Sequence, residues 1–177
     1  MALAVVEWSE DHTYKNAITN ELFLLLSAPG DVKFGNFTYL NNAKLVRVEL
    51  VGTRNGNGLW NDDMSTCKYN EATPWTYKQG VIASGLDFLV KTTGDSSYFA
   101  EAEISLDATI THPSQNDILE EFVTILTRMA STAVVTGYIL LLFKGIWTKH
   151  DQYYLDHAGP TAKCASTLWC QSPAVFK

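Results

Sequence analysis

An imperfect internal repeat narrows the range of folds open to this chain. Each copy reads as a helix, a Gly-Asp turn and a second helix that opens on a tyrosine and a large apolar residue. The turns are Gly30-Asp31 and Gly94-Asp95, and the openings are Tyr39-Leu40 and Tyr98-Phe99. Repeated helical hairpins bury their apolar faces against one another, which predicts a toroid or solenoid of helices. No strand pattern competes, so the fold class is predicted to be all-α.

Hydrophobic periodicity predicts the individual helices. Apolar residues recur at helical spacing over 14–28, 38–51, 79–92, 97–111, 116–129 and 144–158. In the first helix we expect a core stripe made of Ile18, Leu22, Leu25 and Leu26. In the last helix one face carries Ile146, His150, Tyr153 and His157, which could border a ligand cleft or simply belong to an amphipathic outer helix.

The first helix also carries a polar face. Asn16 and Asn20 lie four residues apart, with Glu21 next to Asn20. Polar side chains on a helix normally face water. They could instead line an interior cavity if this helix were an inner stave of a barrel.

Composition excludes several classes of function. A chain of 177 residues with 46% hydrophobic content can form one domain over 1–177. The net charge of −6 and the absence of a basic stripe argue against a nucleic-acid partner. The three cysteines show no metal-binding spacing, and no P-loop or dinucleotide fingerprint is present, so we expect no metal and no cofactor.

An apolar segment near the end of the chain is atypical. Residues 129–143 are uncharged, but the run is shorter than the roughly 20 residues that a membrane span needs. We therefore expect no membrane span, and interpret 129–142 either as a buried helix or as sequence foreign to the original fold. The N-terminus lacks the features of a signal peptide.

The stretch before the third predicted helix is a candidate ligand site. Trp75, Tyr77 and Gln79 follow Pro74 and precede an apolar helical run. Aromatic rings with a polar handle at a helix start suit a site that stacks on a flat-faced ligand and hydrogen-bonds to its edge. The alternative is a helix entry in which the rings fill the core.

Several segments, in chain order, resemble glycoside hydrolase family 76, the endo-α-1,6-mannanases. The matching segments are Tyr14 to Phe23, Gly58 to Asp62 with Cys67, Trp75 to Val81 with Gly85-Leu86, Thr93 to Tyr98, Phe143 to Ile146, and Ala165 to Trp169. The sequence departs from the family at Lys78, where an asparagine is usual, and between Thr127 and Leu142, where the family is polar.

The resemblance implies a fold, an activity and a location. The family folds as a barrel of six helical hairpins, and the resemblance begins midway through it, so we expect about half a barrel. It implies retaining hydrolysis of α-1,6-mannosidic links in cell-wall mannan, outside the cell or in the cell wall. The family's catalytic aspartate pair lies in the earlier half, which this chain is expected to lack. A catalytically inactive fragment that at most binds mannan, or a helical-repeat scaffold, are the alternatives.

The resemblance also implies site residues. It places Trp75, Tyr77 and Gln79, and then Asn16, Asn20 and Glu21, toward the barrel interior as sugar contacts. Asp62-Asp63 is the chain's one adjacent aspartate pair and could supply the two carboxyl groups of a retaining glycosidase. We favour a turn instead, because the family counterpart is an Asn-Asp-Gly turn. Open barrel edges would expose apolar stripes, which predicts self-association.

Overall fold

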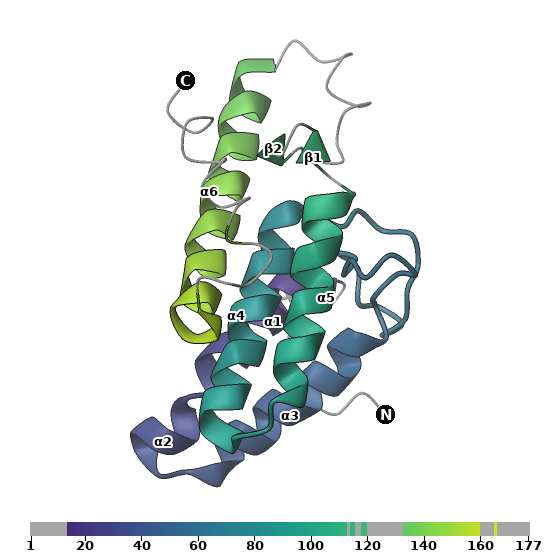
Figure 1. Cartoon of the computed structure of the whole chain (residues 1–177). Helices are drawn as coiled ribbons and strands as arrows, with labels where there is room; N and C mark the ends of the chain where they lie inside the picture. The colour runs from purple at the N-terminus through teal and green to yellow at the C-terminus, as the bar shows by residue number, and fades with distance from the viewer. Residues whose placement is uncertain (1–13, 113, 116–117, 120–132, 160–164, 166–177) are drawn as a thin grey trace.

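The computed structural model describes residues 14–112, 114–115, 118–119, 133–159 and 165, and it confirms the all-α fold (Figure 1). The helices are α1 (Ala17–Ser27), α2 (Gly30–Phe34), α3 (Phe37–Val51), α4 (Thr76–Thr93), α5 (Ser97–Thr111) and α6 (Ala133–Ala158). A two-residue antiparallel pair, β1 (Ser114–Gln115) and β2 (Ile118–Leu119), follows α5.

Helix α4 is the central element of the fold. It packs against α1, α5 and α6, and α1 packs in turn against α3. Figure 1 shows α4 and α6 running in one direction and α5 in the opposite one, as expected of consecutive hairpins. Almost every residue of α4 from Thr76 to Val90 is buried. The long connection between α3 and α4 is bonded to the N-terminal ends of both α1 and α4.

In the next three helices the apolar residues at helical spacing form the buried faces, as periodicity predicts. Helix α3 buries Leu40, Ala43, Val46 and Leu50, and α4 buries Ile82, Leu86, Leu89 and Val90. Helix α5 buries Ala102 and Leu106, while Phe99 and Ile110 pack against the same core from its edge. In these helices the apolar stripe faces the neighbouring helices.

Helix α1 turns a different face to the core from the one that the sequence predicts, so the predicted stripe of Ile18, Leu22, Leu25 and Leu26 is wrong. Leu22 is 40% exposed and Leu26 is 74% exposed, whereas Asn20 and Glu21 are completely buried. The helix lies against both α3 and α4, and its buried face combines the polar Asn20, Glu21 and Ser27 with the apolar Ala17 and Leu24. The prediction failed because it assumed that the most apolar stripe always faces the core.

The chain forms a second, short helix almost directly after α1. Pro29-Gly30-Asp31 was expected to end the helix; α1 does end at Ser27, but a short helix, α2, begins at Gly30. Gly30 has to be small, because a Cβ atom there would lie 2.7 Å from Cβ of Tyr39. Helix α2 then ends at Gly35, whose φ of 63° is easily reached by glycine.

The helix predicted over 116–129 is wrong at its start. Ile118 pairs with Gln115, and Leu119 pairs with Ser114, as a minimal antiparallel ladder. The sequence at 116 and 117 is Asn-Asp, and these two residue types favour turns over helix interiors. The rest of that predicted helix, 120–129, lies outside the described residues.

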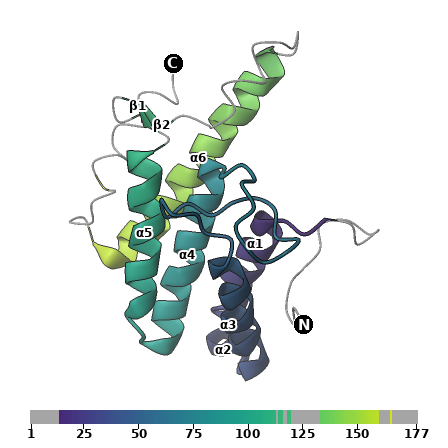
Figure 2. The same cartoon turned by 90° about the vertical axis from the view of Figure 1, so that its right-hand side faces the viewer.

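Helix α6 includes residues from two segments that the sequence analysis treats separately, 129–142 and 144–158. It runs unbroken from Ala133 through the end of the atypical segment and the predicted 144–158 helix. With 26 residues it is about 39 Å long, against about 27 Å for α4. Figures 1 and 2 show its first turns projecting beyond the other helices. Of the helices in the described part of the chain, none is both long and apolar enough to cross a membrane.

Candidate functional site

The candidate site lies where the loop between α3 and α4 covers the N-terminal ends of α1 and α4. The backbone amide of Ala17 donates to the carbonyl of Asp62 at 2.7 Å, and that of Met64 donates to the carbonyl of Lys15 at 2.9 Å. Together with a bridge between Asn16 and Asp63, these bonds fix the loop on the start of α1. A long loop held in this way can present side chains with precision.

The side chain of Gln79 fixes the same loop to α4. Its amide oxygen accepts from the backbone N–H of Trp60 at 2.9 Å, and its amide nitrogen donates to the carbonyl of Trp60 at 2.9 Å. The hydroxyl of Ser105 also donates to the amide oxygen. Gln79 is completely buried. In this structure its amide therefore holds the loop in place.

A buried group of charges lies beneath the loop. Lys78 is completely buried and forms an ion pair with Asp62, which also accepts a 3.0 Å hydrogen bond from the hydroxyl of Tyr14. Glu21 is fully buried nearby. Within the described residues, neither carboxylate oxygen of Glu21 has a hydrogen-bond partner. Burial raises the pKa of Glu21 to about 8, and the charge of Lys78 opposes part of that rise.

Asp62 and Asp63 have separate local partners. Asp62 is bound by Lys78, as described above, while Asp63 accepts from the backbone N–H of Ser65 at 2.7 Å and from the amide of Asn70 at 2.8 Å. An aspartate that accepts from the N–H two residues later forms an Asx turn. Asp63 therefore lies in a turn, as the turn interpretation of this pair expects. A catalytic role for the pair stays a prediction.

The predicted aromatic contacts gather around Phe143 of α6. The ring of Tyr77 lies 4.3 Å from that of Phe143, and the ring of Trp75 meets it edge-on at 5.5 Å. All three side chains are partly exposed. They form an apolar surface of packed rings at the same end of α4 as Lys78.

The side chains of Asn16 and Asn20 form hydrogen bonds with backbone groups at the N-terminal end of α1. Asn16 is the N-cap, and its side-chain oxygen accepts from the backbone N–H of Thr19 at 3.1 Å. Asn20 donates to the backbone carbonyl of Asn16 at 2.8 Å. Both residues are buried, and Asn16 also bridges to Asp63 of the loop. Their role as sugar contacts stays a prediction.

Two polar contacts between α4 and α6 were not predicted. The buried carboxylate of Asp87 contacts His157 at 2.6 Å and Lys91 at 2.7 Å. Nδ1 of His150 lies 3.0 Å from the hydroxyl of Ser84. Burial, with Lys149 beside it, lowers the pKa of His150 to about 4, so its ring is neutral at pH 7. The i, i+4 spacing of Asp87 and Lys91 signals their own ion pair within α4, whereas no local spacing signals the contacts with His150 and His157.

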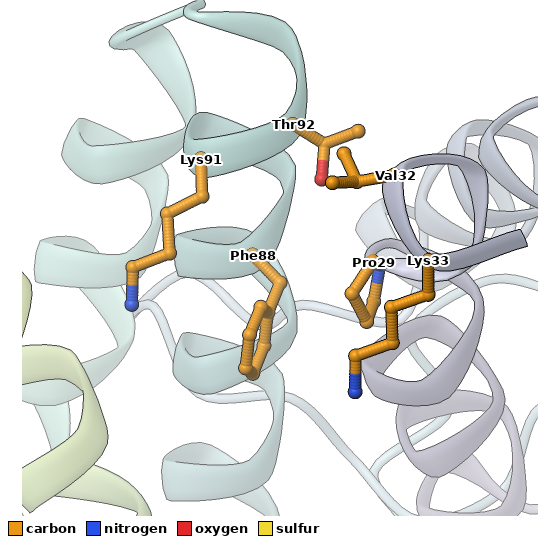
Figure 3. Close-up of a pocket in the computed structure, with 6 residues that line it drawn as sticks. All are labelled: Pro29, Val32, Lys33, Phe88, Lys91 and Thr92. Carbon is orange, nitrogen blue, oxygen red and sulfur yellow. The ribbon is translucent and has the colours of Figure 1, made fainter. Parts of the chain in front are cut away.

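No group of three or more metal-ligating side chains occurs in the described part of the chain. A pocket of about 200 Å³ lies away from the candidate site, between the corner of α1 and α2 and the C-terminal half of α4 (Figure 3). It is lined by Pro29, Val32, Lys33, Phe88, Lys91 and Thr92. Neither the acidic nor the amide residues predicted as sugar contacts line it.

Comparison with known proteins agrees with this architecture. The fold is similar to the crystal structure of the Lin0763 protein from Listeria innocua, with a TM-score of 0.73 and 19% sequence identity over 94% of this chain. The chain spans 46% of the length of that protein. Among curated proteins none matches the chain. Residues 1–135 match glycosyl hydrolase family 76, which covers most of the sequence. The chain therefore belongs to glycosyl hydrolase family 76.

Proposed function

We propose that this chain binds an α-1,6-linked mannan at the N-terminal ends of α1 and α4 and takes part in the retaining hydrolysis of that glycan. Membership of a glycoside hydrolase family supports a glycan as the substrate. The observation that carries the proposal is the partly exposed ring surface of Trp75, Tyr77 and Phe143. Aromatic rings can stack on the apolar faces of pyranose sugars.

The buried residues fix the elements that carry this surface. Asn16, Asn20 and Gln79 fix the start of α1 and the loop, so they act by positioning. Glu21 is completely buried and lies within the electrostatic influence of Lys78. In this arrangement Trp75 and Tyr77 contact the sugar directly. We expect the protein to act outside the cell or in the cell wall, where mannan occurs.

Binding without cleavage is the second candidate. Retaining glycosidases need two carboxyl groups about 5 Å apart, one as acid/base and one as nucleophile. Asp62 is held by Lys78 and Tyr14, and Asp63 by its Asx turn. Their existing partners favour a structural role for both, in which case the described residues would bind mannan but leave catalysis to other groups.

Binding and cleavage can be measured on the same samples. We expect α-1,6-mannooligosaccharides to bind in titration calorimetry and Trp75→Ala to weaken binding at least about tenfold, since one stacked ring is lost. Tyr153→Ala, which removes a partly exposed ring elsewhere on α6, is the matched control. Absence of binding by the unmodified chain would refute the proposal.

Cleavage is followed by release of reducing ends from the same mannooligosaccharides. If Asp62→Asn/Asp63→Asn abolishes cleavage but preserves binding, the pair is catalytic. If the unmodified chain binds without releasing reducing ends, the binding-only function is correct. Retention of configuration is read directly from the anomer formed first, by proton NMR.

A further inference from the structure

We propose that Asp62 determines the specificity of the glycan site, because its carboxylate accepts hydrogen bonds from two adjacent hydroxyls of the bound sugar. The inference rests on the proposed function, since it needs a sugar stacked on the rings of Trp75, Tyr77 and Phe143. It adds the group that recognises the hydroxyl edge of that sugar, and it concerns binding rather than bond cleavage.

Both oxygens of the Asp62 carboxylate are held in place. Oδ1 forms the ion pair with the ammonium of Lys78, and Oδ2 accepts from the hydroxyl of Tyr14 at 3.0 Å. The backbone of Asp62 is fixed as well, because its carbonyl accepts from the amide of Ala17 at 2.7 Å. A polar group that is oriented before the ligand arrives loses little conformational entropy when the ligand binds.

The carboxylate can accept further hydrogen bonds from the solvent side. A carboxylate offers about four acceptor positions, two on each oxygen. In the part of the chain that the structure describes, Lys78 and Tyr14 occupy one position on each oxygen of Asp62. The side chain of Asp62 is 22% exposed, whereas that of Lys78 is completely buried. One remaining position on each of two neighbouring oxygens suits a pair of adjacent hydroxyls.

The carboxylate of Asp62 lies next to the aromatic rings. Nζ of Lys78, which contacts Asp62, is 5.8 Å from the centre of the Tyr77 ring. That ring lies in turn 4.3 Å from the ring of Phe143. One ammonium group therefore separates the carboxylate from the rings. A pyranose stacked on these rings by its apolar face carries its hydroxyls around its edge, where the carboxylate can reach them.

The charges favour an uncharged ligand. Lys78 already balances the charge of Asp62, so the carboxylate needs no cation from the ligand. A second anion close to the carboxylate would be repelled. Hydroxyls donate without carrying charge, and their hydrogen bonds to a charged acceptor are stronger than those between neutral groups. The site therefore selects a neutral ligand rich in hydroxyls, and a mannan is such a ligand.

The linkage of the proposed glycan identifies the decisive hydroxyl. In an internal residue of an α-1,6-linked mannan the free hydroxyls are the 2-, 3- and 4-hydroxyls, because the other positions take part in the linkages and the ring. Every adjacent pair among these three includes the 3-hydroxyl. A carboxylate that accepts from an adjacent pair therefore accepts from the 3-hydroxyl, whichever pair it is.

The test compares two ligands by titration calorimetry of the full chain: the methyl glycoside of α-1,6-mannotriose and its analogue that lacks every 3-hydroxyl. We expect the unmodified chain to bind the analogue about tenfold more weakly, because a hydrogen bond to a charged group is lost. Asp62→Asn should reduce this preference to about twofold or less, since the charged acceptor is gone. A purely structural role of Asp62 would weaken both ligands alike and leave the preference unchanged.

Two further variants make the test specific. Asp95→Asn is the control, because Asp95 is an exposed aspartate that also accepts from the N–H two residues later, at the opposite end of α4. It should keep the full preference. If Asp62→Asn fails to fold because Lys78 is left unpaired, Asp62→Asn/Lys78→Met removes both charges of the buried pair together and should show the same reduced preference. Circular dichroism checks that each variant keeps its helices.

Two results would overturn this inference alone. Equal binding of both ligands by the unmodified chain would show that no 3-hydroxyl is recognised. An undiminished preference in Asp62→Asn would assign that recognition to another group. In both cases Trp75→Ala would still weaken binding, and the proposed function would stand. If the unmodified chain binds neither ligand, the proposed function fails and this inference fails with it.

Discussion

Replacement of Glu21 by glutamine should make the folded chain more stable at neutral pH. The folded chain holds the Glu21 proton up to about pH 8, whereas an unfolded chain releases it near the ordinary value of 4.5. Between these two pH values the folded state binds the extra proton, so stability falls as pH rises. At one pKa unit per 1.36 kcal/mol, about 5 kcal/mol is lost across this window and about 3 kcal/mol of it by pH 7.

Glutamine has nearly the same shape as protonated glutamate but cannot ionise. We therefore expect Glu21→Gln to exceed the unmodified chain by about 3 kcal/mol at pH 7 and to match it near pH 4.5. The assay is urea unfolding followed by circular dichroism at several pH values between 4.5 and 8, at one fixed protein concentration. Glu103→Gln, exposed on α5, is the control. Parallel pH profiles for Glu21→Gln and the unmodified chain would show that Glu21 is ionised in the folded state, which refutes the reasoning.

Three further changes test other parts of the fold. Asp87→Asn should cost about 1 kcal/mol in urea unfolding, because Lys91 and His157, whose side chains are each about a third exposed, lose a charged acceptor. Gly52→Ala should lower the melting temperature, since its Cβ would collide with the carbonyl oxygen of Cys67, whereas Gly56→Ala has open space around it and serves as the control. Burial, aided by a hydrogen bond to a nearby glutamate, raises the pKa of the Cys67 thiol to about 11. With the other two cysteines changed to serine, its reaction with a disulfide reagent at pH 8 should be about a hundredfold slower than that of an ordinary cysteine, and it should accelerate about tenfold per pH unit.

Hydrophobic periodicity was sufficient to place most of the helices. The boundaries of α5 were predicted to the residue, and α3 and α4 began within three residues of their predicted starts. These helices succeed because each directs an apolar stripe at its neighbours, even in α4, where most other positions are buried as well. The Gly94-Asp95 turn between α4 and α5 was predicted correctly too. Gly94 ends α4 with a φ of 74°, a conformation that glycine adopts easily.

Periodicity failed where the buried face is polar. In α1 the burial of Glu21 is tolerated because it can remain protonated and because Lys78, from another helix, lies close to it. This partnership joins residues 57 positions apart and leaves no local trace in the sequence. The same limit applies to Gln79, whose amide holds the backbone of Trp60. Its role as a sugar contact stays a prediction. No spacing in the sequence shows which buried side-chain amide will form hydrogen bonds with a distant backbone segment.

The pairing of Gln79 with Trp60 has a consequence for the exchange of backbone hydrogens. The N–H of Trp60 belongs to no helix and donates to a side chain, so one amide group protects it from solvent. Its exchange rate therefore reports how often the loop separates from α4, either alone or together with unfolding of the helix. A slow rate at this single position would mean that the loop and the aromatic surface beside it move as one rigid unit with α4.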